Sequence, residues 1–277
     1  MATTFKTITA NDVTNTRTLL HEAIPLTGTI ASGTYNDDNI KEFSHGMFQS
    51  VYDYPYLSSS ANHIFDVTHG YSSESALSGA SSVQNSKKIN IYNQMASVLV
   101  GHDATGSIQR FDQDGNIAAG GAKLNEAFFL NFSRLLSKDE IKKDSFRMSF
   151  LTGGTPDART DTLTIGDYGA STSYLVNSPA GEYAVLYTSS ATPNADSGVG
   201  LLYYQAGVAV LTGSIFDGDM GAGVTSGSYD ALATGSNINV MADSIRNRLV
   251  DIDFNNTVEL NSTIYFCRAN HNEFNYS

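Results

Sequence analysis

The sequence contains a single cysteine, Cys267, and no tryptophan in 277 residues. One cysteine excludes an internal disulfide and a cysteine-based zinc site, and it leaves the redox compartment undecided. Because Cys267 follows Tyr265 and Phe266 in a strand-like run, we expect its thiol to be buried and chemically inert. A chain of this length can form a core without disulfides.

Charged residues are also scarce, and basic residues are fewer than acidic ones. They make up 16% of the sequence, and 28 acidic against 16 basic residues give a formal net charge of -12. Such a surface repels phosphate backbones, and the densest basic stretches, `SKDEIKK` and `NSKKIN`, are short. We therefore expect no nucleic-acid partner.

No apolar run is long enough for a membrane span. The longest, `VGLLYYQAGVAVL` at 199–211, is short and contains polar residues, and `MATTFKTITA` lacks the apolar centre of a secretory signal. We expect a protein that neither spans a membrane nor is exported by its own N-terminus.

The residues that resemble catalytic or metal-binding motifs do not have the spacing that those motifs require. `FDQDGNIAAGG` resembles a calcium loop, but Arg110 and Gly121 would occupy the first and twelfth ligand positions, so a turn stabilised by Asx side chains is expected instead. The six histidines show no HxH or HExxH spacing, and no P-loop or GxSxG is present. The acidic pairs `DD` at 37–38 and `DGD` at 217–219 lie in turn-like settings, although a polysaccharide hydrolase would need two such groups across a cleft. We expect no enzyme, no cofactor and no metal.

The pattern of residues predicts an α+β protein with a mixed helical region at 1–144 and a predominantly antiparallel, β-sandwich-like domain at 145–277. Apolar residues at helical spacing and possible caps predict helices at 11–24, 37–54, 81–101 and 136–144. The last of these would begin at Ser137, in a capping box with Glu140.

The second region contains short β-branched and aromatic runs separated by turn residues, which is typical of antiparallel strands. They are `SFRMSFLTG`, `DTLTIGDYG`, `GEYAVLYTSS`, `GLLYYQAGVAVLTGSIF`, `LVDIDFNN` and `NSTIYFCRA`. In `VDIDF` we expect Val250, Ile252 and Phe254 on a buried face, and Gly207 is expected at a bulge or bend. Residues 220–236 are rich in Gly and Ser and are interpreted as a long exposed loop.

Three phrases carry a family resemblance: `FNNTVELNSTIYFCRANHNEFNYS`, `GVGLLYYQAGVAVLTGSIF` and `IRNRLVDIDF`. Over about residues 200–277 the chain resembles virion structural proteins of contractile-tailed bacteriophages, of the marine and cyanobacterial myovirus type. The resemblance implies a tail-associated subunit located in the virion after assembly in the host cytoplasm. Its expected partners are further copies of itself and other virion structural proteins. A receptor- or glycan-binding tail module, with loop aromatics such as Tyr229 stacking on sugars, is the alternative.

The C-terminal stretch is the candidate interface. In the resembled proteins we expect the chain to continue past `NEFNYS`, so the stretch after Cys267 would present an unfinished sheet edge that a partner strand can complete. Phe274 and Tyr276 would lie on one side of an extended chain, with polar residues at the rim. The predicted interface residues are Arg268, His271, Glu273, Phe274 and Tyr276.

Overall fold

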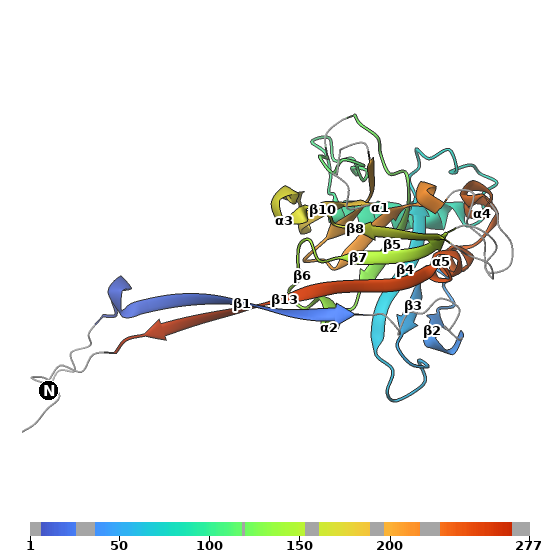
Figure 1. The fold of residues 1–277 in the computed structure, drawn as a ribbon. Helices are drawn as coiled ribbons and strands as arrows, with labels where there is room; N and C mark the ends of the chain where they lie inside the picture. The colour runs from blue at the N-terminus through green and yellow to red at the C-terminus, as the bar shows by residue number, and fades with distance from the viewer. Residues whose placement is uncertain are drawn as a thin grey trace, which may run out of the picture.

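The computed structural model describes residues 7–25, 37–117, 120–152, 161–188, 197–216 and 228–267, and the thirteen strands of this part form one curled antiparallel sheet (Figure 1). The strands are β1 Val13–Pro25, β2 Ile40–Glu42, β3 Gln49–Tyr52, β4 His63–Tyr71, β5 Glu126–Phe132, β6 Glu140–Ile141, β7 Arg147–Thr152, β8 Asp161–Gly166, β9 Leu175–Ser178, β10 Gly181–Tyr187, β11 Gly198–Tyr203, β12 Val208–Thr212 and β13 Leu249–Tyr265. The helices are η1 Ala10–Asp12, η2 Asp37–Asn39, α1 Asn85–Leu99, α2 Arg134–Ser137, α3 Ala170–Ser173, η4 Gly213–Phe216, α4 Tyr229–Gly235 and α5 Ile238–Arg246.

The sheet joins strands from both ends of the chain. Its order is β1-β13-β7-β8-β10-β11-β12-β5-β4-β3-β2, with β6 beside β13 and β9 beside β10. The ranges 1–144 and 145–277 therefore both contribute to it, through the β1–β13 and β5–β12 pairings.

The expected α+β fold, with an N-terminal helical region followed by a β-sandwich-like domain, is wrong. The described part of 1–144 contributes β1 to β6, and the strands of both ranges form one large antiparallel sheet. Residues 13–25 pair with 253–265 as β1, although Val13, Leu20 and Ile24 follow a helical spacing. Local spacing is a weak guide here, because β-branched residues and a distant partner strand favour the extended form.

Two further predicted helices are replaced by turns and short strands. At 37–54, Gly46 has φ +60 in a turn, with its N–H donating to the Phe43 carbonyl at 2.8 Å, and only η2, β2 and β3 form. At 136–144, α2 ends at Ser137 because Lys138 has a positive φ of 54, and Asp144, at φ 63, also lies outside the helical region.

The third helix is confirmed, and the predicted strand segments form strands, except that `LVDIDFNN` and `NSTIYFCRA` belong to one continuous strand, β13. α1 spans 85–99, and Gly101, at φ +94, follows its C-terminal end. In β13, Ile252 and Phe254 are buried, whereas Val250 is half-buried because a bulge between Leu249 and Asp251 gives the core position to Leu249. Gly207 has φ +67 in the turn between β11 and β12, as the expected bend requires.

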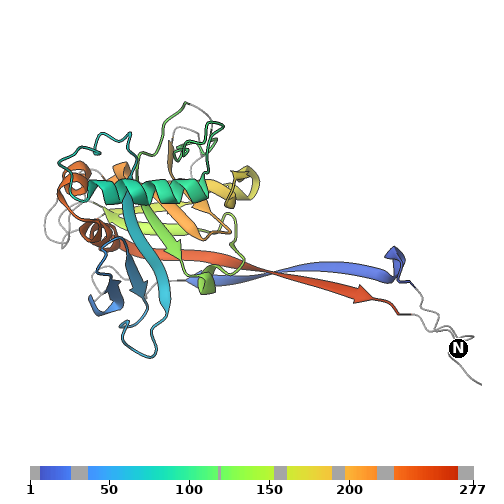
Figure 2. The ribbon, with the colours of Figure 1, turned by 180° about the vertical axis from the view of Figure 1, so that it is seen from behind.

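Side chains alternate between two cores on either face of the sheet. Phe128, Leu130 and Phe132 of β5 enter the larger core inside the curl, whereas Ala127 and Phe129 enter a second core beneath α1. Figure 2 shows α1 lying across this second face. The strand β5 thus contributes side chains to both cores, one on each face of the sheet.

The larger core also holds a buried carboxylate, Asp167. It accepts hydrogen bonds from the backbone N–H groups of Asp144 at 2.6 Å and Phe146 at 3.0 Å, from Arg147 Nη1 at 2.9 Å and from the Tyr204 hydroxyl at 2.8 Å. Burial raises the pKa of Asp167 to about 6, against the lowering effect of these donors. The carboxylate ties the turns before β7 and after β8 to the end of β11.

Candidate interaction surfaces

The predicted interface residues Arg268, His271, Glu273, Phe274 and Tyr276 lie outside the described residues. The C-terminal described range ends at Cys267, and the end of this range, from β13 onward, belongs to a projecting two-stranded ribbon. Phe266 N–H donates to the Asp12 carbonyl at 2.8 Å, which keeps both strands together at the far end.

This ribbon is formed by the outer halves of β1 and β13, and Figures 1 and 2 show it leaving the body of the molecule. Val13 pairs with Tyr265 and Leu20 with Val258 in an unbroken antiparallel register. β7 and β6 pair with β13 only up to Thr257, so beyond that point the described structure gives β13 no partner strand except β1. We call residues 13–20 together with 258–265 the arm.

One face of the arm carries no charge. The register and the two-residue side-chain period place alternate residues of the two strands on this uncharged face. Its members are Thr14, Thr16, Thr18, Leu20, Val258, Leu260, Ser262 and Ile264. Leu20 is 51% exposed, Leu260 48% and Ile264 47%, so apolar side chains lie open to water along its length.

The opposite face of the arm is polar and internally hydrogen-bonded. Arg17 forms an ion pair with Glu259, and Asn261 Nδ2 donates to Glu259 Oε1 at 2.8 Å. The Asn261 and Arg17 donors lower the pKa of Glu259. Thr263 Oγ1 donates to Asn15 Oδ1 at 2.9 Å. This face also exposes Leu19, at 46%, and Tyr265, at 60%. The two faces of the arm therefore differ in charge: one holds the Arg17–Glu259 ion pair, and the other has no charged side chain.

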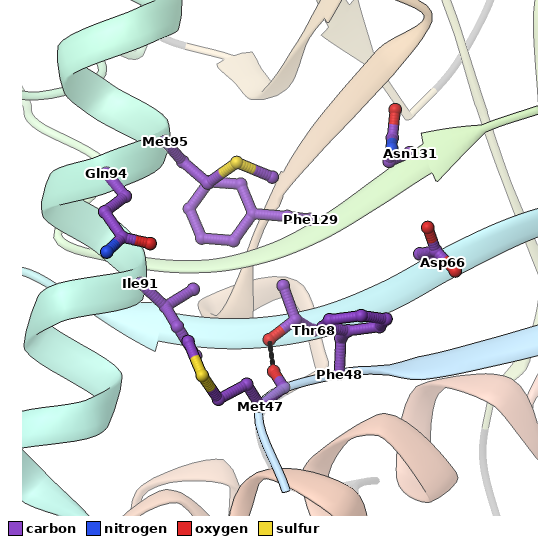
Figure 3. Close-up of a pocket in the computed structure, with 9 residues that line it drawn as sticks. All are labelled: Met47, Phe48, Asp66, Thr68, Ile91, Gln94, Met95, Phe129 and Asn131. Atoms are coloured by element: carbon purple, nitrogen blue, oxygen red, sulfur yellow. Dashed lines mark hydrogen bonds between the residues drawn. The ribbon is translucent and has the colours of Figure 1, made fainter. Parts of the chain in front are cut away.

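A second open surface is a groove beside α1, with a cavity volume of about 260 Å³. It is drawn in Figure 3, where Ile91, Met95 and Phe129 lie on the α1 side of the groove. Its lining residues are Met47, Phe48, Asp66, Thr68, Ile91, Gln94, Met95, Phe129 and Asn131. Most of the lining is apolar and two members are methionines, whose flexible side chains adapt to different partners.

The polar atoms of the groove gather around Asp66 and Thr68. Thr68 Oγ1 donates to the Met47 carbonyl at 2.5 Å, which holds the segment before β3 against β4. Asp66 Oδ1 accepts from Ser50 Oγ at 2.5 Å and lies 2.8 Å from His63 Nε2. Figure 3 places Asp66 and Asn131 together, away from Met95 and Gln94. The groove therefore has an apolar end and an end with hydrogen-bond acceptors.

The calcium-like sequence forms the expected turn. Asp112 Oδ1 accepts from Asp114 N–H at 3.4 Å, and Asp114 Oδ1 accepts from Asn116 N–H at 3.0 Å, while Lys123 forms an ion pair with Asp112. Within the described ranges, no three His, Cys, Asp or Glu side chains are grouped to hold a metal ion. In the same ranges, no helix has the length and hydropathy needed to cross a bilayer.

Tyr229 is not available for sugar stacking, which corrects the expectation of an exposed loop throughout 220–236. Residues 217–227 lie outside the described part, and 229–235 form α4. The Tyr229 side chain is 2% exposed, and its hydroxyl lies 2.7 Å from His69 Nε2. A glycan-binding alternative would need other aromatic residues.

His69 gives the fold a predicted acid sensitivity. Burial, with a smaller contribution from Lys88, lowers the pKa of His69 from 6.5 to about 3. Between these values the unfolded chain binds a proton that the folded protein does not. The free energy of unfolding should therefore fall on acidification below about pH 6, by about 1.4 kcal/mol per pH unit from this group. Urea unfolding of His69→Phe should lose that part of the slope, and an unchanged slope would contradict the assignment.

Cys267 is exposed, so the expectation of a buried, inert thiol is wrong. It follows the end of β13 at the tip of the arm, and neither described core includes a residue of that tip. We now expect Ellman labelling of the native protein to be nearly as fast as labelling in denaturant. Labelling slowed by a hundredfold or more in dilute native protein, an order-of-magnitude criterion for burial, would contradict this placement.

Comparison with known proteins finds no family model, no curated protein and no solved structure that matches this chain.

Proposed function

We propose that the chain is a structural subunit of a tailed-phage virion, in the tail, baseplate, neck or a fibre attachment, acting through protein–protein contacts between copies and with other virion proteins. The observation that carries the proposal is the arm. A two-stranded ribbon is marginally stable alone in water, and this one exposes Leu20, Leu260 and Ile264 on a face without charge.

The chemistry of the chain supports assembly in other ways. Its net charge of -12 favours solubility before assembly, because bodies of like charge repel one another. The polar face of the arm is already hydrogen-bonded within the ribbon, so covering the uncharged face would leave no charged group of the arm without water or a partner. The resemblance of residues 200–277 to phage virion proteins gives this chemistry its biological setting.

The test is mass spectrometry of purified particles together with a cryo-EM map. We expect the chain in a fixed copy number per particle, at a position of regular symmetry. Absence from purified particles, with the protein found only in infected-cell lysate, would refute the proposal.

The alternative of a receptor- or glycan-binding module retains one supporting observation. The β3–β4 connection exposes Tyr54, at 56%, and Leu57, at 85%, beside Tyr56. Exposed tyrosines of this kind can stack on sugar faces. Binding of the protein to a glycan array that is lost in Tyr54→Ala would favour this function over a purely structural one.

A further inference from the structure

We propose that the uncharged face of the arm of one copy docks in the groove beside α1 of a second copy. This inference rests on the proposed function and names the surfaces and the partner through which it would act. It follows from two open surfaces on the same chain: the groove beside α1, and the arm, which Figures 1 and 2 show leaving the body of the molecule.

The apolar side chains on the uncharged face of the arm are exposed, and no other described element of the same molecule packs on them. In the body, Ile252 and Phe254 of β13 are buried in the larger core. Because side chains two residues apart lie on the same side of a strand, Val258, Leu260 and Ile264 lie on this side of β13 as well. The side of β13 that packs on the core inside the body thus continues outward along the arm, where none of the described elements covers it. Since the arm points away from the body, it cannot return to its own groove while the β1–β13 register is kept.

The groove and the uncharged face are chemically complementary. Met47, Phe48 and Met95 offer adaptable apolar contact for leucine and isoleucine side chains. At the other end, Asp66 is acceptor-only when ionised and Asn131 carries an amide oxygen, which suit the hydroxyl donors of the arm. The hydroxyl groups on the uncharged face that can donate to the groove are those of Thr14, Thr18 and Ser262, whereas Thr16 Oγ1 donates to the Ser262 carbonyl at 3.4 Å within the arm.

The charges near the groove favour the uncharged face of a second copy's arm over an anionic or strongly basic partner. The arm brings no charged side chain on the docking face beside Asp66, so neither repulsion nor a buried unpaired charge results. A second copy always carries the matching surface. Because the arm and the groove are different surfaces, the contact is heterologous, and each copy can make it twice, which produces rings or helical arrays.

The first measurement is sedimentation equilibrium of the full chain over a wide concentration range. We expect reversible association that is weakened at least about tenfold, corresponding to about 1.4 kcal/mol, by Leu260→Asn on the arm or by Met95→Glu in the groove. Two matched controls use the same substitutions at similar sites. Leu19→Asn lies on the polar face at 46% exposure, and Val98→Glu lies on α1 at 65% exposure outside the groove lining.

The controls should change the association constant by less than about threefold, within the usual range for surface substitutions. Circular dichroism and thermal unfolding of each variant establish that the body is folded. Association that is equally weakened by Leu19→Asn and Leu260→Asn would overturn the role of the uncharged face. A wild-type chain that is monomeric at every concentration would overturn the second copy as occupant and point to the chain's own terminal residues or another protein.

Mixing the two defective variants tests the arm–groove pairing itself. Leu260→Asn keeps an intact groove and Met95→Glu keeps an intact arm, so their mixture should form a one-to-one dimer that neither variant forms alone. If arms paired with arms, mixing would restore nothing, and the groove would be excluded. The presence of the wild-type chain in purified particles is a separate result, so the proposed function can stand while this pairing fails, or the reverse.

Discussion

Replacing Asp167 with Asn is expected to lower the free energy of unfolding by about 3 kcal/mol when measured at about pH 8, where the carboxylate is ionised. The side chain is completely buried and accepts from two backbone N–H groups, from Arg147 and from Tyr204. An amide has one acceptor oxygen in place of two, and its NH₂ group would face existing donors. Urea unfolding followed by circular dichroism measures the change.

The matched control is Asp103→Asn. Asp103 is fully exposed and accepts hydrogen bonds only within its own turn, from Thr105 and Ser107. Its replacement should lower the free energy of unfolding far less than the replacement of Asp167, because a surface substitution leaves no buried donor without a partner. Equal losses in the two variants would show that the buried carboxylate does not hold the turns before β7 and after β8.

Phe132→Ala should lower the free energy of unfolding by about 3–5 kcal/mol, the usual cost of removing a buried aromatic ring. Phe132 ends β5 and lies with its ring centroid 5.4 Å from Phe254 of β13, 5.7 Å from Phe146 and 6.1 Å from Phe65 of β4. It thus packs the two sides of the curled sheet against one another. Thermal or urea unfolding gives the measurement.

Phe266→Ala provides the control for this substitution, because Phe266 is 53% exposed at the end of the arm. Its effect on unfolding of the body should stay below about 1 kcal/mol. A small loss for Phe132→Ala would mean that the larger core tolerates a cavity at the place where the sheet curls.

Local patterns in the sequence predicted the helices and strands that are determined by residues close together in the chain. α1 combines a helical apolar stripe at 91–99 with a following glycine, and the strands of the second region alternate within short segments bounded by turn residues. The segment at 13–25 is different. Its Thr14, Thr16 and Thr18 alternate as in a strand, yet Val13, Leu20 and Ile24 fit a helix equally well, and only pairing with residues 253–265 decides between them.

The interaction surfaces could be predicted only in part. The aromatic C-terminal stretch was expected to be an interface at 268–276, and that expectation lies outside the described residues. The arm that leads to it was missed, although the threonine alternation at 14–18 was a signal for it. The groove could not have been predicted, since Met47, Asp66, Met95 and Phe129 meet only after β4, β5 and α1 pack together. Cys267 was misjudged because a strand-like sequence does not reveal whether a layer covers the strand.

The central claim, that the arm is an assembly device covered by another subunit, is tested most directly by hydrogen–deuterium exchange of peptides spanning 13–20 and 258–266. In dilute protein these amides should exchange fast, because within the described residues β13 has no partner strand except β1 beyond Thr257. At assembly concentration they should become strongly protected, together with peptides of α1 that line the groove. Protection of the arm that is already complete in dilute protein, or that does not change on assembly, would contradict the account.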